Sequence, residues 1–406
     1  MSKKHSVVIV GGGIVGATAG CALAQAGIAV TLIDAHNPAR EWPADPVDIR
    51  VSALTRASQN ILQAVGAWPA MEQRGIGPYD HMHVWDASSA GTLDFDAADT
   101  EFTALGHLVE NRVTLASLWD RLESLPTASI VCPAKVADLQ IASDSAKVVL
   151  EDGQILTAEL VIAADGRDSV LRQMAGIQTT GWEYKQDGLV ATISTEKSHQ
   201  FTAWQRFLPE GPLAFLPLKN GQCSIVWTLS HQTAQNYLSL SDEDFLQQLE
   251  QASDGVMGKI LAVGPRGAFP LRFQYANQYS ADHFVLIGDA AHAMHPLAGQ
   301  GANAGLLDAA AIAELIINAQ QANRPLGRHK LVRQYERWRK GDNLAMMNSM
   351  DMINKMYTAQ NEVSRQLRGT GMSWVNHNAW LKNYFNRYAM GLRDDLPSLA
   401  STETNA

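Results

Sequence analysis

The residues best suited to chemistry lie between Gly288 and Asn303, in the stretch GDAAHAMHPLAGQGAN. An apolar run from Phe284 ends in Asp289, and the chain then passes through Pro296 and a glycine-rich turn into an alanine-rich segment. A carboxylate accepts hydrogen bonds from ligand hydroxyl groups, and the free N–H groups of residues 299–303 at a helix start can face an electron-rich ring edge. The layout suits a large planar cofactor such as a flavin, with Asp289 at its ribityl chain.

A second pattern lies near the N-terminus, where VVIVGGGIVGA begins at Val7 and is followed by an apolar run that ends in Asp34. In a strand, glycine turn and helix of this kind, Gly11 makes the tight turn and Gly13 lets the backbone approach a pyrophosphate. Gly16 permits close packing of helix and strand, and Asp34 is placed to bind a ribose hydroxyl. An acid here favours an unphosphorylated ribose, as in FAD or NAD; a purely structural glycine turn is the alternative.

Length and composition set the outer limits. A chain of 406 residues with 46% hydrophobic and 18% charged residues is globular and long enough for two or three units. A net charge of −9 argues against general binding of nucleic acid. The three cysteines are widely spaced and form no metal or disulfide motif, and no metal site is expected. No apolar run is long enough for a transmembrane helix, so we expect a cytoplasmic protein.

The C-terminal part is basic. Residues 328–393 contain twelve Lys and Arg against four Asp and Glu, a local charge of +8. Trp374, Trp380 and Tyr384 alternate there with Lys382 and Arg387. This pattern is typical of a surface-seeking amphipathic segment that contacts the inner face of a membrane or a partner complex. An ordinary helix with a solvated basic face is the alternative.

The middle of the chain predicts the elements that position these segments. We expect a long loop over residues 35–49, a helix from Arg50 to near Gly66, a hairpin over residues 82–96 and a helix over residues 111–125. A buried strand ends at Asp165-Gly166. An aspartate after such a strand either serves the cofactor site or caps the next helix.

Alternating runs between residues 188 and 229 predict successive strands of an antiparallel sheet that can cover the cofactor. Their aromatic side chains either line an apolar substrate tunnel or form the ordinary inner face of a sheet. These side chains are Trp204, Phe207, Phe215 and Trp227.

The glycine fingerprint, the Asp165-Gly166 segment and the distal GDAAHAMHPLAGQGAN stretch together resemble the single-component flavin aromatic hydroxylases. Within that group the chain is similar to the ubiquinone-biosynthesis hydroxylases, and the resemblance runs from Val7 to about Leu392. The similar stretches are RVSAL from Arg50, VENR ending at Arg112, AFLPL from Ala214 and HPLAGQG from His295.

The resemblance implies an α/β fold with three parts. The first is a Rossmann-like FAD-binding domain of the glutathione-reductase and p-hydroxybenzoate-hydroxylase type, expected over residues 1–77, 98–184 and 271–340. The second is a substrate domain built on an antiparallel β-sheet, expected over residues 78–97 and 185–270. The third is a C-terminal helical segment over residues 341–406.

The resemblance also assigns site residues. Those expected to bind FAD are Gly11, Gly13, Gly16, Asp34, Arg50, Arg112, Asp165, Gly288, Asp289, Pro296, Gly299, Gln300, Gly301 and Asn303. Arg112 is preferred to Arg50 as a direct ligand, because Arg50 could serve a mobile loop. His295 is the one candidate catalytic residue, as a base near the flavin, with a structural histidine as the alternative; His292 is expected to be structural.

Enzymes of this family hydroxylate an aromatic ring by way of a flavin C4a-hydroperoxide, with O2 as co-substrate and NADPH or NADH as the expected electron donor. The implied substrate is a polyprenylated phenol or quinol of ubiquinone biosynthesis, with ring position C6 or C5 slightly favoured over C1. Two alternatives stay open. One is another flavoprotein on the same fold, such as a prenyl-lipid reductase. The other is a non-catalytic flavin-bearing component of a quinone-biosynthesis assembly.

Overall fold

The computed structural model describes residues 4–43, 46–294, 299–358, 362–393 and 395–401. Its first sheet is mostly parallel and carries the N-terminal glycine turn. Along this sheet the order is β17 (Ser280–Ala281), β18 (Phe284–Leu286), β11 (Ile155–Ala163), β1 (Lys4–Val10), β2 (Val30–Ile33) and β8 (Ala128–Val131). The antiparallel strands β10 (Ala146–Leu150) and β9 (Val136–Ile141) extend it from β11.

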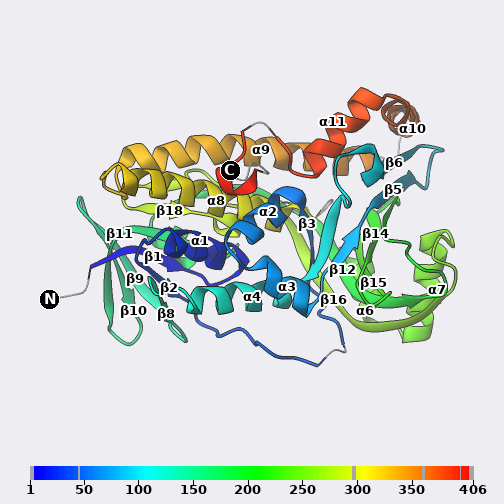
Figure 1. Cartoon of the computed structure of the whole chain (residues 1–406). Helices are drawn as coiled ribbons and strands as arrows, with labels where there is room; N and C mark the ends of the chain where they lie inside the picture. The colour runs from blue at the N-terminus through cyan, green and yellow to red at the C-terminus, as the bar shows by residue number, and fades with distance from the viewer. Residues whose placement is uncertain (1–3, 44–45, 295–298, 359–361, 394, 402–406) are drawn as a thin grey trace.

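The second sheet is antiparallel except where β13 and β5 run parallel. Its order is β19 (His292–Ala293), β16 (Ile260–Ala276), β12 (Thr179–Thr195), β15 (Cys223–Ser230), β14 (Pro212–Pro217), β13 (Thr202–Phe207), β5 (His81–Asp86) and β6 (Thr92–Asp96). A small sheet of β3 (Val51–Thr55), β7 (Gly106–Glu110) and β4 (Gly77–Tyr79) lies between the two larger ones (Figure 1).

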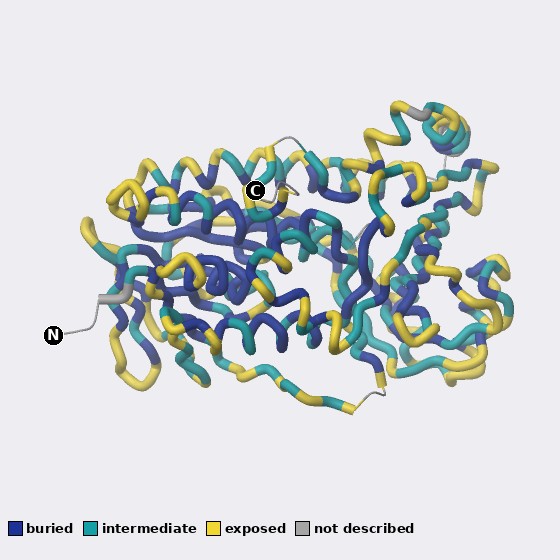
Figure 2. Tube along the Cα trace, in the orientation of Figure 1, coloured by how far each residue is buried: buried dark blue, intermediate teal, exposed yellow. Residues whose placement is uncertain are grey.

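Helices cover both large sheets. Around the first sheet lie α1 (Ile14–Gln25), α2 (Arg56–Ala64), α3 (Trp68–Arg74), α4 (Asn111–Glu123), α5 (Val170–Met174) and α8 (Gln300–Gln321). The second sheet is covered by α6 (His231–Ser239) and α7 (Asp242–Ser253). The C-terminal helices are α9 (His329–Thr358), α10 (Glu362–His377) and α11 (Ala379–Ala389), with α9 lying along α8. Figure 2 shows the buried core running through the first sheet, α1 and α8.

Helix α8 is long and apolar enough to cross a membrane by length and composition. However, 78% of its most apolar 18-residue window is buried inside the fold. Nine of its 22 residues are Gly or Ala, which lets α1 pack directly against it. We therefore describe α8 as the central core helix.

The α/β fold expected from the sequence is observed, with one local difference in an element. The helix expected from Arg50 is a strand up to Thr55, and α2 begins only at Arg56. The reason is tertiary, because Val51–Thr55 pairs with β7, some fifty residues later. The strands expected between residues 188 and 229 are present, and β13, β14 and β15 pair antiparallel in chain order, whereas β12 joins them through β15 and pairs on its other side with the long strand β16.

The C-terminal helices are anchored to the second sheet. Arg368 of α10, with only 4% of its surface exposed, donates from Nη1 to the carbonyl of Tyr357 at 2.8 Å and from Nη2 to Ser88 Oγ at 2.8 Å. Its Nε lies 3.4 Å from the carboxylate of Asp86 at the end of β5. Helix α9 runs through residue 340, after which the resemblance places the start of the C-terminal helical segment.

Loss of core volume in α8 should destabilise the fold. Ile312 is wholly buried, so Ile312→Ala should lower the free energy of unfolding by about 2–5 kcal/mol, from lost transfer energy and a residual cavity. Ile155→Ala, at a side chain 51% exposed, should cost far less. Urea unfolding of the two apoproteins measures both. Equal losses would contradict the placement of α8 in the core.

Candidate functional site

The parallel strands bring the predicted segments to one edge of the first sheet. Strands β18, β11, β1 and β2 are parallel neighbours, so their carboxyl ends lie side by side. Gly288, Asp165, Gly11 and Asp34 follow the ends of these four strands. Ligands of open α/β sheets bind at this edge. Four segments that are far apart in sequence are thus collected at one place.

The glycine fingerprint has the geometry that its spacing predicts. Gly11 has φ +103°, and a Cβ there would overlap the Ala164 carbonyl group. A Cβ on Gly16 would overlap the Gly11 carbonyl oxygen, so β1, α1 and the end of β11 approach as only glycine allows. At Gly13 no described atom would come within 4 Å of an added Cβ, and no described side chain caps α1 there. This helix start is therefore open to an anionic ligand.

Asp34 closes the fingerprint turn. Its Oδ2 accepts a hydrogen bond from the Gly12 N–H at 2.5 Å, and its Oδ1 accepts one from His36 N–H at 2.8 Å. Trp119 of α4 donates from Nε1 to the Gly12 carbonyl at 2.6 Å and fixes the turn from the other side. Each carboxylate oxygen of Asp34 retains a lone pair, which a ribose hydroxyl can use.

Arg112 and Arg50 differ in how they are held. Arg112 donates to Glu110 at 2.7 Å and to the Pro46 carbonyl at 3.1 Å, and its guanidinium lies 4.9 Å from the Trp42 ring centroid. It therefore ties the start of α4 to the long loop before β3. Arg50 is exposed, with its guanidinium 5.1 Å from the ring centroid of Phe269 on β16.

The carboxylate of Asp165 is used within the chain. It accepts hydrogen bonds from Ser169 Oγ at 2.6 Å and from Leu171 N–H at 3.1 Å, at the start of α5. The helix-capping alternative considered for this residue describes these contacts. A cofactor role for Asp165 remains a prediction and would use its remaining lone pairs.

Arg172 was absent from the predicted site. Only 5% exposed, it donates from Nη1 to the Ala290 carbonyl at 2.8 Å and from Nη2 to the Arg167 carbonyl at 2.9 Å. It therefore joins the turn after Asp165 to the turn that carries Asp289. The available signal in the sequence was an arginine seven residues after Asp165, on the helix that follows the end of β11.

The turn over Gly288–Ala290 presents Asp289. This carboxylate is exposed and receives no hydrogen bond from any described residue. Desolvation by the surrounding protein nevertheless raises its pKa above the usual range, while the positive fields of His292, Arg167 and Arg50 oppose the rise. The Asp289 carboxylate is thus accessible to solvent and yet surrounded by protein. It is free to accept bonds from a ligand.

Helix α8 begins beside this turn. Gly299 has φ +61° and precedes the helix without a side-chain cap among the described residues; Gln300 and Gly301 form its first turn. An added Cβ on Gly301 would meet no described atom within 4 Å. Within the described chain, the start of α8 is thus as open as that of α1, and both can face a ligand.

Asn303 has a different role from the backbone around it. Its Nδ2 donates to the Ala53 carbonyl at 2.9 Å, and its Oδ1 accepts from Thr55 N–H at 3.0 Å and from Ser58 Oγ at 2.7 Å. The side chain therefore joins α8 to β3 and α2 and is not available to a ligand. Any contact of this residue with a cofactor would come from its backbone. His295 and Pro296 lie outside the described residues.

Val15 links the proximal and distal segments. A Cβ added to Gly288 would lie 3.2 Å from Val15, and one added to Gly305 of α8 would lie 2.5 Å from it. The two glycines therefore let α1, α8 and the Asp289 turn pack closely.

The four aromatic side chains considered for a tunnel lie in packed clusters. Phe215 and Trp227 are buried between the second sheet and its helices α6 and α7, and Trp204 packs against the same cluster. Phe207 belongs to a separate cluster, where its ring stacks on Tyr357 of α9. The ordinary sheet-core interpretation describes all four.

Taken together, the residues present fit a dinucleotide. Two open helix starts, that of α1 at Gly13 and that of α8 at Gly299, meet the Asp289 carboxylate, which no described residue hydrogen-bonds, at the carboxyl edge of the parallel strands. The fold is that of the FAD-dependent monooxygenases. It is similar to p-nitrophenol 4-monooxygenase PnpA from Pseudomonas putida DLL-E4, with a TM-score of 0.79 and 18% identity over 97% of this chain and 100% of that one. It is also similar to PqsL of Pseudomonas aeruginosa, with a TM-score of 0.75 and 20% identity over 91% of this chain and 100% of that one.

Comparison of the sequence with known proteins shows the family of this chain. Residues 4–349 match the family described as FAD binding domain. The chain is 37% identical to ubiquinone hydroxylase UbiL of Rhodospirillum rubrum, over 96% of this chain and 90% of that protein. It is 33% identical to 3-demethoxyubiquinol 3-hydroxylase of Escherichia coli, over 96% of this chain and 100% of that protein. The chain therefore belongs to the FAD-dependent ubiquinone-hydroxylase family, as the resemblance implied.

Asp289 generates the first prediction about the site. Asp289→Asn should raise the dissociation constant of FAD about tenfold or more, because charge-assisted hydrogen bonds to the ribityl chain become neutral ones. The same change should stabilise the apoprotein at neutral pH. With a raised folded-state pKa, this carboxyl stabilises the fold when protonated, and that stabilisation is lost as the pH rises through the raised pKa.

Fluorescence titration of the apoprotein with FAD and thermal unfolding without FAD measure the two effects. Asp282→Asn, at an exposed carboxylate seven residues upstream, is the matched control and should leave FAD affinity unchanged. Unchanged affinity in Asp289→Asn would remove Asp289 from the cofactor site.

Proposed function

We propose that this chain hydroxylates the aromatic ring of a polyprenylated phenol or quinol intermediate of ubiquinone biosynthesis. The observation that carries the proposal is the similarity, over nearly the whole length of each pair of chains, to one protein named ubiquinone hydroxylase and to another named 3-demethoxyubiquinol 3-hydroxylase. For the ring position we favour C6 or C5 over C1.

In the proposed reaction one atom of O2 is added to the ring and the other leaves as water. NADPH or NADH supplies two electrons and is oxidised, and one proton is taken up. When bound, FAD supplies the redox chemistry and oxygen activation that side chains lack. The protein's part is to bind, orient and exclude water.

Different residues of the site are suited to different parts of FAD. The open start of α1 at Gly13 is suited to the pyrophosphate, and Asp34 to the ribose of the adenosine half. Asp289 is suited to the ribityl hydroxyls, and the open start of α8 to the electron-rich edge of the ring system. Arg112 and Arg50 provide positive charge for the pyrophosphate or the ring. His295 is retained as the proposed base that draws the proton from the substrate hydroxyl.

We assign substrate binding to the second sheet with α6 and α7. Strands β5 and β6 from residues 78–97 join it, and its β12 and β16 extend beyond the range 185–270 toward the first sheet. Through β19 the sheet is hydrogen-bonded to residues just beyond Asp289. A substrate held on this sheet would therefore lie close to the cofactor.

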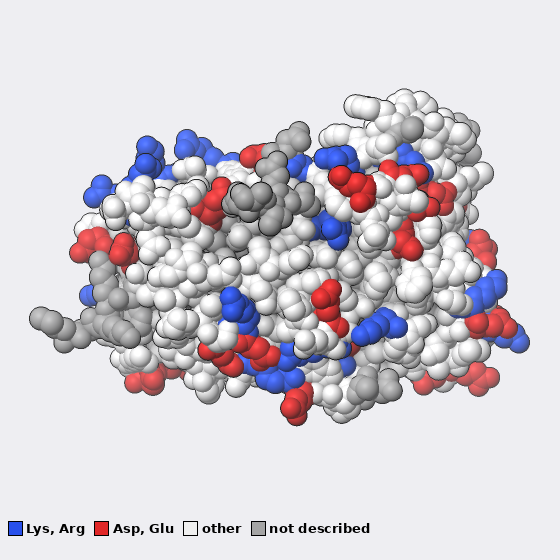
Figure 3. Space-filling view, in the orientation of Figure 1, with Lys and Arg blue, Asp and Glu red and all other residues white. Residues whose placement is uncertain are grey.

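We further propose that the protein works at the inner face of a membrane, where a prenylated substrate resides. The basic C-terminal region carries less unpaired positive charge than its composition indicates. At least six of its cations pair with carboxylates: Arg333, Arg339, Lys355, Arg368, Lys382 and Arg393. Arg328, Lys330 and Arg337 at the start of α9 are exposed. Figure 3 shows Lys and Arg along the upper left edge of the molecule, where α9 begins. The region over α10 and α11 carries few charges on the face in view.

An aromatic surface lies at the other end of α9. Trp380 and Tyr384 of α11 are 76% and 54% exposed, and their rings stack at 6.2 Å between centroids. Trp374 of α10 and Phe385 of α11 are also exposed. Amphipathic aromatic rings favour the headgroup level of a bilayer, and free cations favour anionic lipids. We therefore propose α11 and the start of α9 as the membrane-facing side.

The pathway can be tested in cells. Cells lacking this chain should accumulate one under-hydroxylated prenyl phenol or quinol in lipid extracts analysed by mass spectrometry, and wild type or Asp282→Asn should clear it. Asp289→Asn should clear it poorly.

The purified enzyme should consume O2 with NADPH or NADH only when a prenylated phenol is present. His295→Ala should slow that turnover, because His295 is the proposed base. An unchanged quinone profile would contradict the assigned pathway, and turnover without O2 uptake would favour a reductase.

The membrane contact can be tested with vesicles. The double variant Trp380→Ser/Tyr384→Ser should bind vesicles of phosphatidylcholine and phosphatidylglycerol about tenfold less tightly than wild type in a sedimentation assay. Leu261→Ser, at an apolar side chain 60% exposed on β16, is the control. Added salt should weaken wild-type binding. Equal binding by both variants would contradict this surface.

A further inference from the structure

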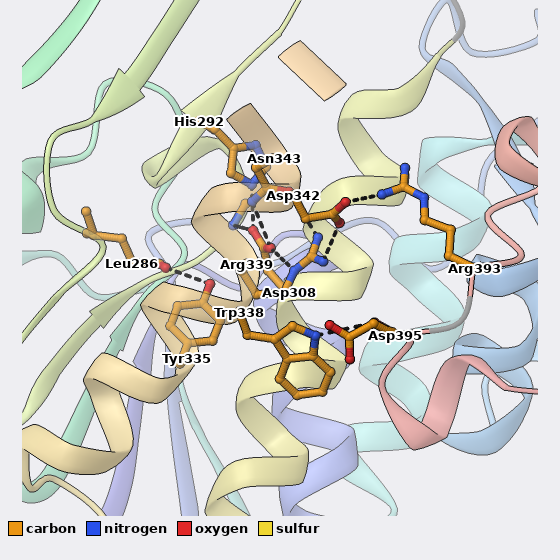
Figure 4. A network of polar contacts seen from close by, with 11 residues as sticks. Leu286, His292, Asp308, Tyr335, Trp338, Arg339, Asp342, Asn343, Arg393 and Asp395 are labelled. Atoms are coloured by element: carbon orange, nitrogen blue, oxygen red, sulfur yellow. Dashed lines mark hydrogen bonds and ion pairs between the residues drawn. The ribbon is translucent and has the colours of Figure 1, made fainter. Parts of the chain in front are cut away.

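A buried polar network joins α8 and α9 to the residues on either side of Asp289 (Figure 4). At its centre is Asp308 of α8, which is wholly buried. Its Oδ2 accepts hydrogen bonds from Gly288 N–H at 3.1 Å and from His292 Nε2 at 2.5 Å. Its Oδ1 accepts from Arg339 Nε at 2.8 Å and from Asn343 Nδ2 at 3.1 Å, both on α9. One carboxylate thus joins the cofactor turn, the core helix and the C-terminal helix.

The central pair is ionised despite its burial. Desolvation alone would raise the pKa of Asp308, but His292 and Arg339 outweigh it and lower the pKa to about 2. Burial would likewise lower the pKa of Arg339, but Asp308 and Asp342 outweigh it and raise that pKa. A buried ion pair of this kind is weak evidence for stability, because apolar residues of similar size often stabilise a core as well or better. A reason other than stability is therefore to be sought.

The position of the network supplies that reason. Asp308 holds Gly288, the residue before Asp289, and His292, three residues after it. It therefore fixes both ends of the short turn that presents the Asp289 carboxylate. The network also acts on that carboxylate through its field, since His292 lowers the pKa of Asp289 and Asp308 raises it, after the larger effect of desolvation.

Helix α9 holds the network from the other side. Arg339 extends from Asp308 to Asn343 Oδ1 at 3.0 Å and to Asp342 Oδ2 at 2.7 Å, and Asp342 also pairs with Arg393 beyond α11. Tyr335, one turn earlier on α9, donates to the Leu286 carbonyl at 3.0 Å, just before the turn. Contacts from the C-terminal helix thus reach the strand end and the turn.

We propose that Asp308 and Arg339 are positioning residues for FAD, and that α9 sets the geometry of the Asp289 turn through them. This inference rests on the proposed placement of the ribityl chain against Asp289. Asp308 touches the turn by its backbone and Arg339 keeps Asp308 ionised and oriented. Neither residue needs to contact the cofactor.

The test compares FAD affinity with the stability of the apoprotein. Asp308→Asn and Arg339→Met should raise the FAD dissociation constant about tenfold, measured by fluorescence titration well below each apoprotein's unfolding temperature. The visible absorption and circular dichroism of bound flavin should shift, because the ring and ribityl chain lose a fixed partner. Arg339→Lys, which keeps the charge but cannot reach Asp308, Asp342 and Asn343 together, should be intermediate. Arg324→Met, at an exposed arginine between α8 and α9, is the matched control and should behave as wild type.

Removing one member of a buried ion pair can unfold a protein, so a milder variant is included. Asp342→Asn, at a side chain 31% exposed, leaves the Asp308–Arg339 contact in place but weakens the outer support of Arg339. It should weaken FAD binding by a smaller factor than Arg339→Met. The inference is overturned if Arg339→Lys and Asp342→Asn lower the apoprotein's unfolding temperature while FAD affinity and flavin spectra stay as in wild type.

Asp289→Asn in the same titration separates the two proposals. If it leaves FAD affinity unchanged, the proposed placement of the cofactor is wrong. If Asp289→Asn weakens binding but Asp308→Asn does not, the placement stands and the positioning role is wrong.

Discussion

The fully buried Asp308 carboxylate is the constraint on which the cofactor edge of this protein depends. An ionised carboxylate is tolerated away from water only when donors satisfy it. Here the donors come from the turn after β18 and from α9, while the carboxylate itself is on α8. These three elements must therefore assemble together, since any one missing would leave a charge buried without its partners. The cooperative assembly places the distal cofactor segment against the core.

Close backbone approach is the second requirement, and small residues meet it. Val15 of α1 packs against Gly288 and Gly305, so the first helix of the fingerprint lies directly on α8 and the distal turn. Because β18, β11, β1 and β2 are parallel, the turns that follow them share one edge. Packing and strand direction together bring residues 11, 165 and 288 to one site. Neither condition alone would do so.

The sequence predicts what local spacing determines and misses what distant pairing determines. The glycine fingerprint, Asp34 and the start of α8 follow from strand, turn and helix signals within a few residues. The contacts of Arg172 with Ala290 and of Arg339 with Asp308 join residues far apart, and no local pattern contains them. The strand at Val51–Thr55 was expected to be helical for the same reason, since its partner β7 lies beyond the local window.

The distribution of charged residues shows the same difference between what a local pattern predicts and what distant contacts determine. The count of cations in residues 328–393 predicts a basic surface, but Arg368 and Lys382 pair with Asp86 and Asp99, which lie more than 280 residues earlier in the chain. Composition gives the number of charges in a segment but does not show where in the fold their ion-pair partners lie. Exposed positive charge therefore lies at the start of α9 and also, at Arg387, on α11 beside the aromatic surface.

The Asp289 turn combines a rigid frame with an unsatisfied group. Gly288 and His292 at its ends are held by a buried ion pair, whereas no described residue donates to the Asp289 carboxylate between them. Desolvation raises the pKa of that carboxyl, so its ionised form is less favourable in the folded chain than in water. Both ends of this turn are thus fixed, while Asp289 within it has no hydrogen-bond donor among the described residues. The carboxylate is therefore held in place to accept hydrogen bonds from a ligand. The hydroxyl groups of a ribityl chain are donors of that kind, and FAD is the ligand of the family to which this chain belongs.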